Sequence, residues 1–305
     1  MISRRTFLGK ATGLVAGTIA LGGYAFGVEP LLRLNITRYQ LTPPGWPTGL
    51  NLRICALADL HAVNPGMNLD RIARIVSAAN GLKPDLMLLL GDYSRGRTQG
   101  WTIPPNVWAP ALAKLRAPLG VHAILGNHDW WDDRAAQLAE HGPTQNGTAL
   151  QASGIPVYHN QAVQLIKDGQ PFWLAGLADQ LALLPSKLLG RKTMMGFADL
   201  AGTLAQVTDD APVLLMAHEP DVFAKVPARV SLTLSGHTHG GQVRVLGYSP
   251  VVPSQFGNRY AYGHIKEEGR DLIVSGGLGC SIIPVRLGVP PELVVVELGE
   301  RQGVV

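Results

Sequence analysis

The stretch Leu86-Met87-Leu88-Leu89-Leu90-Gly91-Asp92 is an unbroken apolar run that ends in a glycine and a carboxylate. A short run without polar residues is typical of a strand buried on both faces of a sheet. Two similar runs flank it along the chain, at Leu52–Leu57 and Val121–Leu125, and helices are predicted between the three runs at Leu69–Ala79 and Asn106–Leu115. This alternation predicts a layered α/β domain with parallel strands in its first half.

The second half of the chain has more strand candidates and little predicted helix between the last four. The candidates are Phe172–Leu177, Pro212–Met216, Leu232–Leu234, Val243–Leu246, Leu272–Ser275 and Leu293–Leu298. Two stacked mixed β-sheets flanked by helices accommodate both halves. Residues 29–50 are rich in proline and glycine and are predicted to be a lead-in segment rather than a packed element. The predicted catalytic domain therefore covers residues 51–305.

Polar side chains follow each predicted strand of the first half. Asp59 and His61 follow the first strand, Asp92 follows the second, and Asn127-His128-Asp129 follow the third. Ligands of open α/β sheets bind at the carboxyl ends of the strands, so these residues are predicted to meet at one edge. The glycines before Asp92 and Asn127 suit tight turns that bring the backbone close to a bound ion.

Histidines occupy the same kind of position in the second half. His218 follows one apolar run, and Gly236-His237-Thr238-His239-Gly240-Gly241 follows another. Alternate residues of an extended backbone share a face, so His237 and His239 are predicted to point at the same site. Imidazole and carboxylate ligands together suit Zn²⁺, Mn²⁺ or Fe, and seven such groups are too many for one tetrahedral ion. Two divalent ions about 3.5–4 Å apart, sharing one carboxylate, are the predicted cofactors.

The order of these blocks from Asp59 to His239 resembles the calcineurin-like metallophosphoesterase family. The resemblance implies a four-layer αββα sandwich and a dinuclear hydrolase of phosphoesters, with phosphodiesters favoured. It also implies that each metal has three ligands of its own and that Asp92 bridges both. One metal would be held by Asp59, His61 and His239, and the other by Asn127, His218 and His237.

The same resemblance assigns a catalytic role to His128, which is not a ligand. A hydroxide held between the two metals would attack phosphorus, while His128 stabilises the transition state or protonates the leaving group. Asp129 is interpreted in two ways, as the carboxylate that orients His128 or as part of a solvated turn.

The first residues, Ser3-Arg4-Arg5-Thr6-Phe7-Leu8, precede an uncharged run from Ala11 to Val28. This arrangement resembles the bacterial twin-arginine signal, which exports folded proteins. Residues 1–28 are therefore predicted to direct export to the periplasm or the outer face of the cytoplasmic membrane. An uncleaved membrane anchor through residues 11–28 is the alternative. The tail motifs Gly277-Leu278-Gly279 and Pro284-Val285-Arg286-Leu287-Gly288 resemble the exported bacterial subgroup of the family.

Charge and cysteine content exclude other classes of protein. The formal net charge is +4, and it falls to +1 without residues 1–27, so no nucleic-acid partner is expected. The two cysteines, Cys55 and Cys280, have no metal-type spacing and are interpreted as small buried residues rather than a disulfide.

The substrate is less defined than the metal site. A phosphorylated small molecule or a lipid-linked phosphate is expected, with Arg95, Arg97, Arg259 and Arg286 as candidate phosphate contacts. The segment Leu181–Phe197 mixes apolar and basic residues and is interpreted as a packed helix and loop or as a flap that faces lipid. A membrane-associated pyrophosphate hydrolase of the UDP-2,3-diacylglucosamine type is one alternative function, and a non-catalytic metal-binding scaffold is another.

Overall fold

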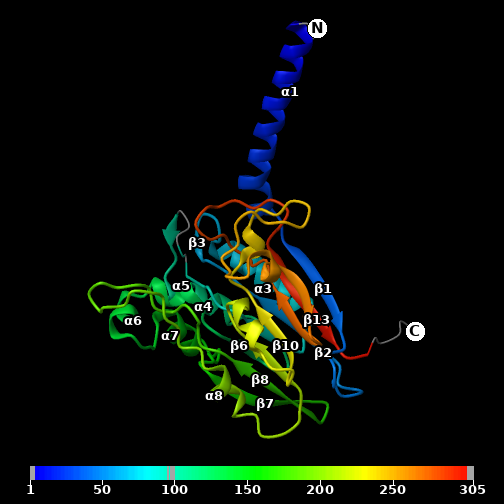
Figure 1. Cartoon of the computed structure of the whole chain (residues 1–305), viewed down its shortest axis with the longest axis vertical. Coiled ribbons are helices and arrows are strands. Elements are labelled where there is room, and N and C mark those ends of the chain that lie inside the picture. Colours follow the sequence, from blue (N-terminus) through cyan, green and yellow to red (C-terminus); the bar gives the residue numbers. More distant parts are fainter. Residues whose placement is uncertain (1–3, 95, 97–99, 301–305) are drawn as a thin grey trace.

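The three apolar runs of the first half form parallel neighbouring strands in the computed structural model, which describes residues 4–94, 96 and 100–300. They are β2 (Leu52–Leu57), β4 (Leu86–Leu89) and β6 (Val121–Ala123). β13 (Glu292–Leu298) lies antiparallel to β2, and β1 (Asn35–Leu41) lies parallel to β13. The resulting five-stranded sheet has the order β1-β13-β2-β4-β6 (Figure 1).

A second sheet of six strands has the order β11-β12-β10-β9-β8-β7. Its strands, in chain order, are β7 (Gln161–Lys167), β8 (Gln170–Gly176), β9 (Val213–Met216), β10 (Val230–Ser235), β11 (Gly263–Glu267) and β12 (Arg270–Val274). The four central strands are parallel and the two edge strands are antiparallel, so this sheet is mixed. A short ribbon of β3 (Val63–Asn64) and β5 (Trp101–Thr102) lies outside both sheets.

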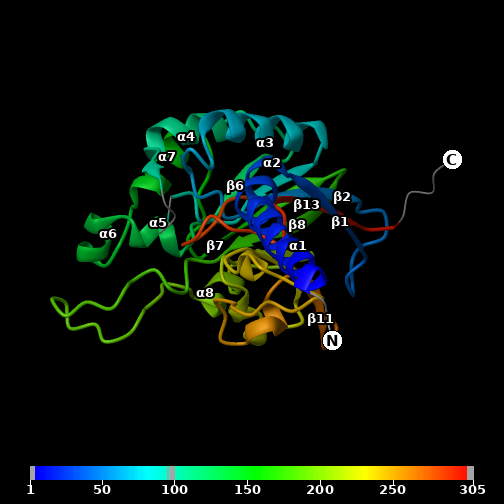
Figure 2. The ribbon, with the colours of Figure 1, turned by 90° about the horizontal axis from the view of Figure 1, so that it is seen from above.

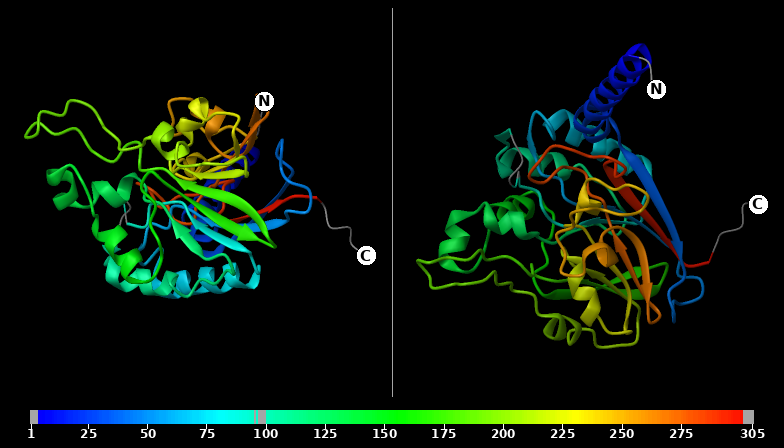
Figure 3. Two further views of the ribbon diagram at one scale, coloured as in Figure 1. Left: turned by 90° about the horizontal axis from the view of Figure 1, so that it is seen from below. Right: turned by 45° about the horizontal axis from the view of Figure 1, so that its top comes forward.

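Helices form the outer layers. The helices α3 (Leu69–Gly81), α4 (Pro105–Leu112) and α7 (Gln145–Ala152) cover the outer face of the first sheet (Figures 2 and 3). Shorter helices complete the chain: α5 (Asn127–Trp131), α6 (Arg134–Ala139), α8 (Leu200–Leu204), η2 (Pro220–Lys225), η3 (His239–Gly241) and η4 (Gly257–Tyr260). At the N-terminus α1 (Arg4–Gly23), the π-helical η1 (Tyr24–Val28) and α2 (Glu29–Leu32) follow one another directly.

Successive side chains of a strand point to opposite faces of its sheet, so a central strand of the first sheet contributes to two core layers. In β2, Ile54 and Ala56 belong to the core between the sheets, where they meet β9 and β10. Their neighbours Cys55 and Leu57 belong to the core between the first sheet and its helices. The prediction of two stacked mixed sheets flanked by helices is confirmed.

Some predicted element boundaries were wrong. Residues 29–50 are not merely a lead-in, because β1 extends the first sheet and Trp46 and Leu50 are buried. Val243–Leu246 is not a strand, since only isolated bridges to Leu287 and Tyr248 form there. The two antiparallel edge strands β7 and β11 were not predicted, because their exposed face interrupts the apolar run with polar residues.

The segment Leu181–Phe197 is neither a packed helix nor wholly exposed. Its base joins the core through Leu183, whose backbone exchanges two hydrogen bonds with Met195. Its tip exposes Leu188 to solvent, Met194 nearer the base is also exposed, and the loop extends from the side of the molecule (Figure 2). Contact of this loop with lipid remains a prediction.

Both cysteines are buried, as the sequence indicated, and no disulfide joins them in the described structure. Burial raises the pKa of the Cys55 thiol to about 12, so the reactive thiolate is scarce at pH 8. We expect no labelling of Cys55 by Ellman's reagent at pH 8 in the native protein, and full labelling after denaturation. The matched measurement uses Cys280→Ser, which leaves Cys55 as the sole thiol, and labelling of that native variant within minutes would contradict the packing.

Candidate metal centre

All seven predicted ligands converge between the two sheets, at the carboxyl ends of the central strands. Each lies in the short segment after a strand, and each is at least nine-tenths buried. The first sheet contributes Asp59, His61, Asp92 and Asn127, and the second contributes His218, His237 and His239. Parallel strands end at the same edge, so residues far apart in sequence meet here.

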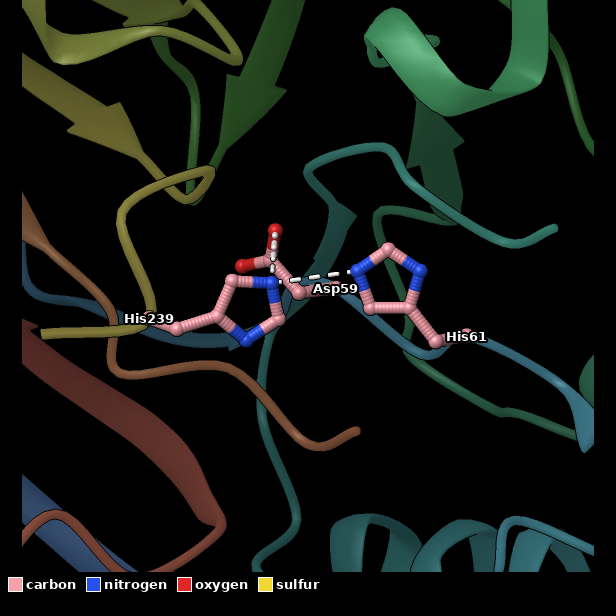
Figure 4. Close-up of side chains that lie close together, drawn as sticks. All are labelled: Asp59, His61 and His239. Atoms are coloured by element: carbon pink, nitrogen blue, oxygen red, sulfur yellow. Dashed lines mark hydrogen bonds and ion pairs between the residues drawn. The ribbon is translucent and has the colours of Figure 1, made fainter. Parts of the chain in front are cut away.

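The first group consists of Asp59, His61 and His239 (Figure 4). The Nε2 atoms of the two imidazoles are 3.1 Å apart, and Nε2 of His239 is 3.6 Å from Oδ1 of Asp59. Nδ1 of His61 lies 2.8 Å from the backbone oxygen of Ser94. Because that oxygen can only accept, His61 is assigned the tautomer that carries its proton on Nδ1. Its Nε2 lone pair therefore faces the other two ligands, as a cation site requires.

The second group consists of Asp92, His218 and His237. His218 donates from Nδ1 to the backbone oxygen of Leu90, which directs its Nε2 to Oδ2 of Asp92 at 3.2 Å. Asn127 completes this group, since its Oδ1 lies 2.8 Å from Nδ1 of His237. Oδ2 of Asp92 also lies 3.7 Å from Nε2 of His61, so this carboxylate stands between the groups.

The backbone at the site is strained. Five of the seven candidates have a positive φ: Asp59 (53°), His61 (47°), Asp92 (58°), His237 (69°) and His239 (51°). Left-handed backbone disfavours L side chains, and such residues gather at functional sites. His237 and His239 reach the same centre as predicted, one in each group, but the extended backbone given as the reason is wrong, because both residues lie in left-handed turns.

Two glycines permit the close approach of the segments. A Cβ on Gly91 would lie 2.5 Å from the backbone nitrogen of Gly126 and 2.8 Å from Nδ1 of His218. A Cβ on Gly126 would collide with Oδ1 of Asp92 and would lie 2.6 Å from the His218 ring. These glycines let the strand ends and the ligands pack in direct contact.

Replacing Gly126 by alanine is therefore expected to displace Asp92 and His218. We expect metal affinity to fall about 10–100-fold, the usual effect of disturbing the support of a metal ligand. Titration of metal-free protein with Mn²⁺ measures this. Gly81→Ala is the control, since no atom lies within 4 Å of its added Cβ. Unchanged affinity in Gly126→Ala would show that the site tolerates the methyl group.

His128 lies beside the site without joining either group. Its ring is buried and lies edge-on to His61 at 5.3 Å and to Trp131 at 5.0 Å between ring centroids. Its backbone N–H donates to Oδ1 of Asp92 at 2.9 Å. The Nδ1 atom has no hydrogen-bond partner among the described residues. One buried polar ring atom beside the site is thus without a hydrogen-bond partner in the described structure.

Asp129 has a role that neither interpretation of the sequence anticipated. It is buried, so the solvated turn is wrong, and no hydrogen bond joins its carboxylate to His128 in the described structure. Oδ2 accepts from the backbone of Asp92 and Gly126, and Oδ1 accepts from the backbone of Tyr93. The carboxylate therefore holds two ligand-bearing segments together. The sequence signal for this role is that Asp129 lies only two residues after the candidate ligand Asn127.

Burial dominates the electrostatics of the site. It raises the pKa of the Asp59 carboxyl to about 7 and lowers the pKa of the His61 and His237 imidazoles. Burial also opposes charge on His218, but the adjacent Asp92 carboxylate outweighs it and raises the His218 pKa well above its ordinary value. The cluster thus favours a positive charge next to Asp92, which a divalent cation would supply.

The predicted phosphate contacts are not confirmed. Arg286 is fully buried and donates to the backbone oxygens of Gly279 and Val289, with one Nη 3.2 Å from Nδ1 of His239. Through this contact Arg286 helps to position His239, a member of the first group. Arg259 is held by Glu267 through two contacts of 2.7 Å, so its guanidinium is already paired. The other two, Arg95 and Arg97, lie outside the described residues.

The donor set fits two divalent cations. Three imidazole or carboxylate ligands form each group, and the ligand atoms within a group lie within 4.8 Å of one another. Nδ2 of Asn127 and Nε2 of His218 are buried without a hydrogen-bond partner in the described part of the chain. Nitrogen and oxygen donors of this kind suit Mn²⁺, Zn²⁺ or Fe.

Comparison with known proteins agrees with this chemistry. Residues 52–241 match the family described as calcineurin-like phosphoesterase. The chain is 30% identical to an uncharacterized metallophosphoesterase of Bacillus subtilis, YkuE, over 97% of this chain and 98% of that protein. It is 29% identical to the phosphodiesterase YaeI of Escherichia coli over 98% of this chain and all of that protein (100%).

A vertebrate protein is also similar. The chain is 27% identical to a transmembrane protein with a metallophosphoesterase domain from Danio rerio, over 92% of this chain and 60% of that protein. All three similarities include the segments that bear the seven candidate ligands, since each covers more than nine-tenths of this chain.

Proposed function

The chain belongs to the calcineurin-like phosphoesterase family, and we propose that it hydrolyses phosphodiester bonds at the cell envelope with two divalent cations. The observation that carries the proposal is the convergence of seven buried ligands, in two groups that share Asp92. A buried site of this size without a substrate to transform would be a costly arrangement of charge and strain.

The proposed ligand roles follow the contacts. Asp59, His61 and His239 would hold one cation, Asn127, His218 and His237 would hold the other, and Asp92 would serve both. Bound cations would activate a water molecule and neutralise phosphoryl charge. The protein fixes the imidazoles through their second nitrogens, as His61 does with Ser94 and His218 with Leu90.

We assign the proton-donating role to His128. Its ring lies edge-on to His61, its backbone N–H donates to Asp92, and its Nδ1 is unpaired among the described residues, which suits contact with a phosphoryl or leaving-group oxygen. A group at this position assists departure of the alcohol without occupying a metal ligand site.

The cell-envelope part of the proposal depends on the N-terminal helix. The segment Gly13–Leu32 is long and apolar enough to cross a membrane, and only 17% of its most apolar window is buried. Together with Ser3-Arg4-Arg5, this favours twin-arginine export, with residues 11–28 as signal or anchor. Replacing Arg4 and Arg5 by lysine should keep the protein inside the cell, and unchanged export in a fractionation experiment would refute the route.

A substrate panel tests the activity. Full-length protein loaded with Mn²⁺, Zn²⁺ or Fe²⁺ is incubated with bis(p-nitrophenyl) phosphate and p-nitrophenyl phosphate, before and after treatment with a chelator. We expect faster release of nitrophenol from the diester, loss on chelation and recovery when metal returns. Faster hydrolysis of the monoester would refute the diester preference. No turnover of either compound by fully metal-loaded protein would refute the hydrolase.

A further inference from the structure

The N-terminal helix leaves the molecule at the end where β1 begins (Figure 1). Since β13 is parallel to β1 and β2 is antiparallel to β13, the carboxyl end of β2, which Asp59 and His61 follow, lies at that same end. The backbone N–H of Arg286 donates to the oxygen of Ala25 at 2.9 Å, which ties the base of the helix to the body. Pro30, Leu31 and the candidate ligand His61 line the same cavity of about 30 Å³. The base of the helix and the metal site therefore adjoin one cavity.

Exposed apolar side chains surround this base. We call them the apolar rim: Phe26, Leu32, Val245, Leu246, Ile282 and Ile283. The loops that carry the last four flank the base of α1 in Figures 1 and 3. Leu246 is fully exposed, and 59% of Ile282 is exposed. Single apolar residues are common on surfaces, but a group on two adjoining loops and a helix marks a site of contact.

The rim loops are continuous with the metal centre. Gln242, three residues after the ligand His239, accepts from the backbone of Ser281 at 2.7 Å and donates to the oxygen of Ile283 at 3.2 Å. The backbone N–H of Arg244 donates to the oxygen of Leu287 at 2.8 Å. These bonds hold the two loops together and join them to the segment that carries His239.

Local backbone preference does not explain the exposure of two rim residues. Leu246 and Ile282 have φ of 51° and 63°, a region that L side chains disfavour and that β-branched residues rarely enter. The surrounding hydrogen bonds keep both residues in this conformation with their apolar side chains directed outward. The sequence thus places large apolar groups where a polar residue or glycine would fit the backbone better.

The length of the helix indicates what covers the rim. The uncharged part that precedes contact with the body, Ala11 to Gly23, would extend only about 20 Å, whereas the hydrocarbon layer of a bilayer is about 30 Å thick. The apolar segment would continue into the lipid boundary through the exposed side chains at its base, Phe26, Leu31 and Leu32, whereas Glu29 and Pro30 stay packed on the body. Arg33 donates to the Tyr24 hydroxyl at 2.8 Å, and such aromatic and basic residues are typical of that boundary.

We propose that the apolar rim docks on the phospholipid surface of the bilayer that holds α1, so that the metal centre opens toward lipid headgroups. The substrate would then be a phosphodiester carried by an amphiphilic lipid, taken directly from the membrane surface. The substrate class rests on the proposed hydrolase activity, whereas the docking rests on the rim and the helix alone.

A bilayer fits the rim better than a second copy of the chain. The helix α1 extends for 20 residues from the middle of the rim, and a flat protein partner would collide with it. A bilayer accommodates the helix and the rim together, because the helix inserts while the side chains around its base contact the interface.

Lipid contact is measured on the full-length protein in phosphatidylcholine–phosphatidylglycerol vesicles. Cysteine is introduced at Leu246, at Ile282 or at the control Ile166, and each variant is labelled with an environment-sensitive fluorophore. Ile166 is also an exposed apolar residue, but its neighbour Lys167 pairs with Asp85 at the start of β4, at the opposite end of the sheet. Unsubstituted protein, whose two cysteines are buried, serves as the blank.

Spin-labelled lipids are expected to quench the probes at Leu246 and Ile282 at least threefold more than the probe at Ile166. Equal quenching at all three positions would overturn the docking. The emission of the probe at Leu246 is also recorded in detergent without lipid, at several protein concentrations. A shift of this emission with protein concentration would show that the rim binds a second copy of the chain, and it would overturn the docking on lipid.

The substrate class is tested by comparing two diesters. Leu246→Asp and Ile282→Asp are expected to lower hydrolysis of vesicle-embedded hexadecyl p-nitrophenyl phosphate about tenfold, with hydrolysis of soluble bis(p-nitrophenyl) phosphate within twofold of wild type. Equal losses on both substrates would overturn the lipid-substrate inference. If wild type hydrolyses neither compound, the proposed hydrolase fails, while the quenching result still decides the docking.

Discussion

Replacing Asp92 by alanine is expected to remove both metal ions and all measurable phosphodiesterase activity. Oδ2 of this carboxylate lies 3.2 Å from Nε2 of His218 and 3.7 Å from Nε2 of His61, so one substitution affects both groups. Disturbing a residue that only supports a metal ligand costs about 10–100-fold in affinity, and the loss of a shared ligand should exceed that.

The Asp92 experiment needs a variant that separates charge from shape. Asp92→Asn retains an oxygen that can accept from the backbone N–H of His128, now at 2.9 Å, but it removes the negative charge. We expect it to lose most metal as well, because charge rather than shape attracts the cations. Asp210→Ala, at an exposed carboxylate away from the site, is the control.

Elemental analysis and kcat/KM for bis(p-nitrophenyl) phosphate are measured on all three variants. A folded Asp92→Ala protein that retains two metals per chain would refute the shared role. Thermal unfolding of the metal-free proteins identifies any variant that fails to fold, and in that event Asp92→Asn decides the question.

Replacing His128 by alanine is expected to abolish most activity while both metals stay bound, unlike the replacement of Asp92, which removes both. Removal of a group that assists proton transfer typically lowers kcat by about 10²–10⁴-fold. No contact places the His128 ring within either ligand group, so elemental analysis should still find two metals. The matched control is His141→Ala, because His141 is an exposed histidine whose Nδ1 bonds to the backbone oxygen of the adjacent Gly142.

Leaving-group dependence distinguishes chemistry from structure in the His128 variant. If His128 assists the departing oxygen, the loss should be larger for a diester with a poor leaving group than for the activated nitrophenyl diester. A uniform loss, or a loss of metal together with activity, would show that the residue only supports the site.

Much of the site was predictable because its residues follow strands. The apolar run before Asp92 and the run before Asn127 could be recognised by composition, and both polar ends meet at one edge in any parallel sheet. The edge strand β1 was not recognised, because its alternate residues are exposed and prolines follow it. Its pairing with β13 joins the two ends of the chain, which no local pattern reports.

The role of Asp129 shows a different limit. Its position next to His128 in the sequence suggested that it orients that imidazole. Its oxygens instead accept hydrogen bonds from the backbone N–H groups of Asp92, Tyr93 and Gly126. A carboxylate accepts from whichever buried N–H groups the fold presents, since an unpaired N–H is costly. The prediction that Arg286 contacts phosphate also failed at this level. Its sequence neighbours do not show that the fold buries its guanidinium beside His239.

The sequence by itself determined the fold class, the family and the set of candidate ligands, because strand periodicity and the chemistry of metal donors are local properties. The resemblance to the family implied which ligand belongs to which group, but only the tertiary structure showed the backbone that directs them there. His237 and His239 are two residues apart, yet left-handed turns at both positions direct them to different groups. Only the packed structure also places the apolar rim beside the helix and the metal centre, since these segments meet through long-range contacts.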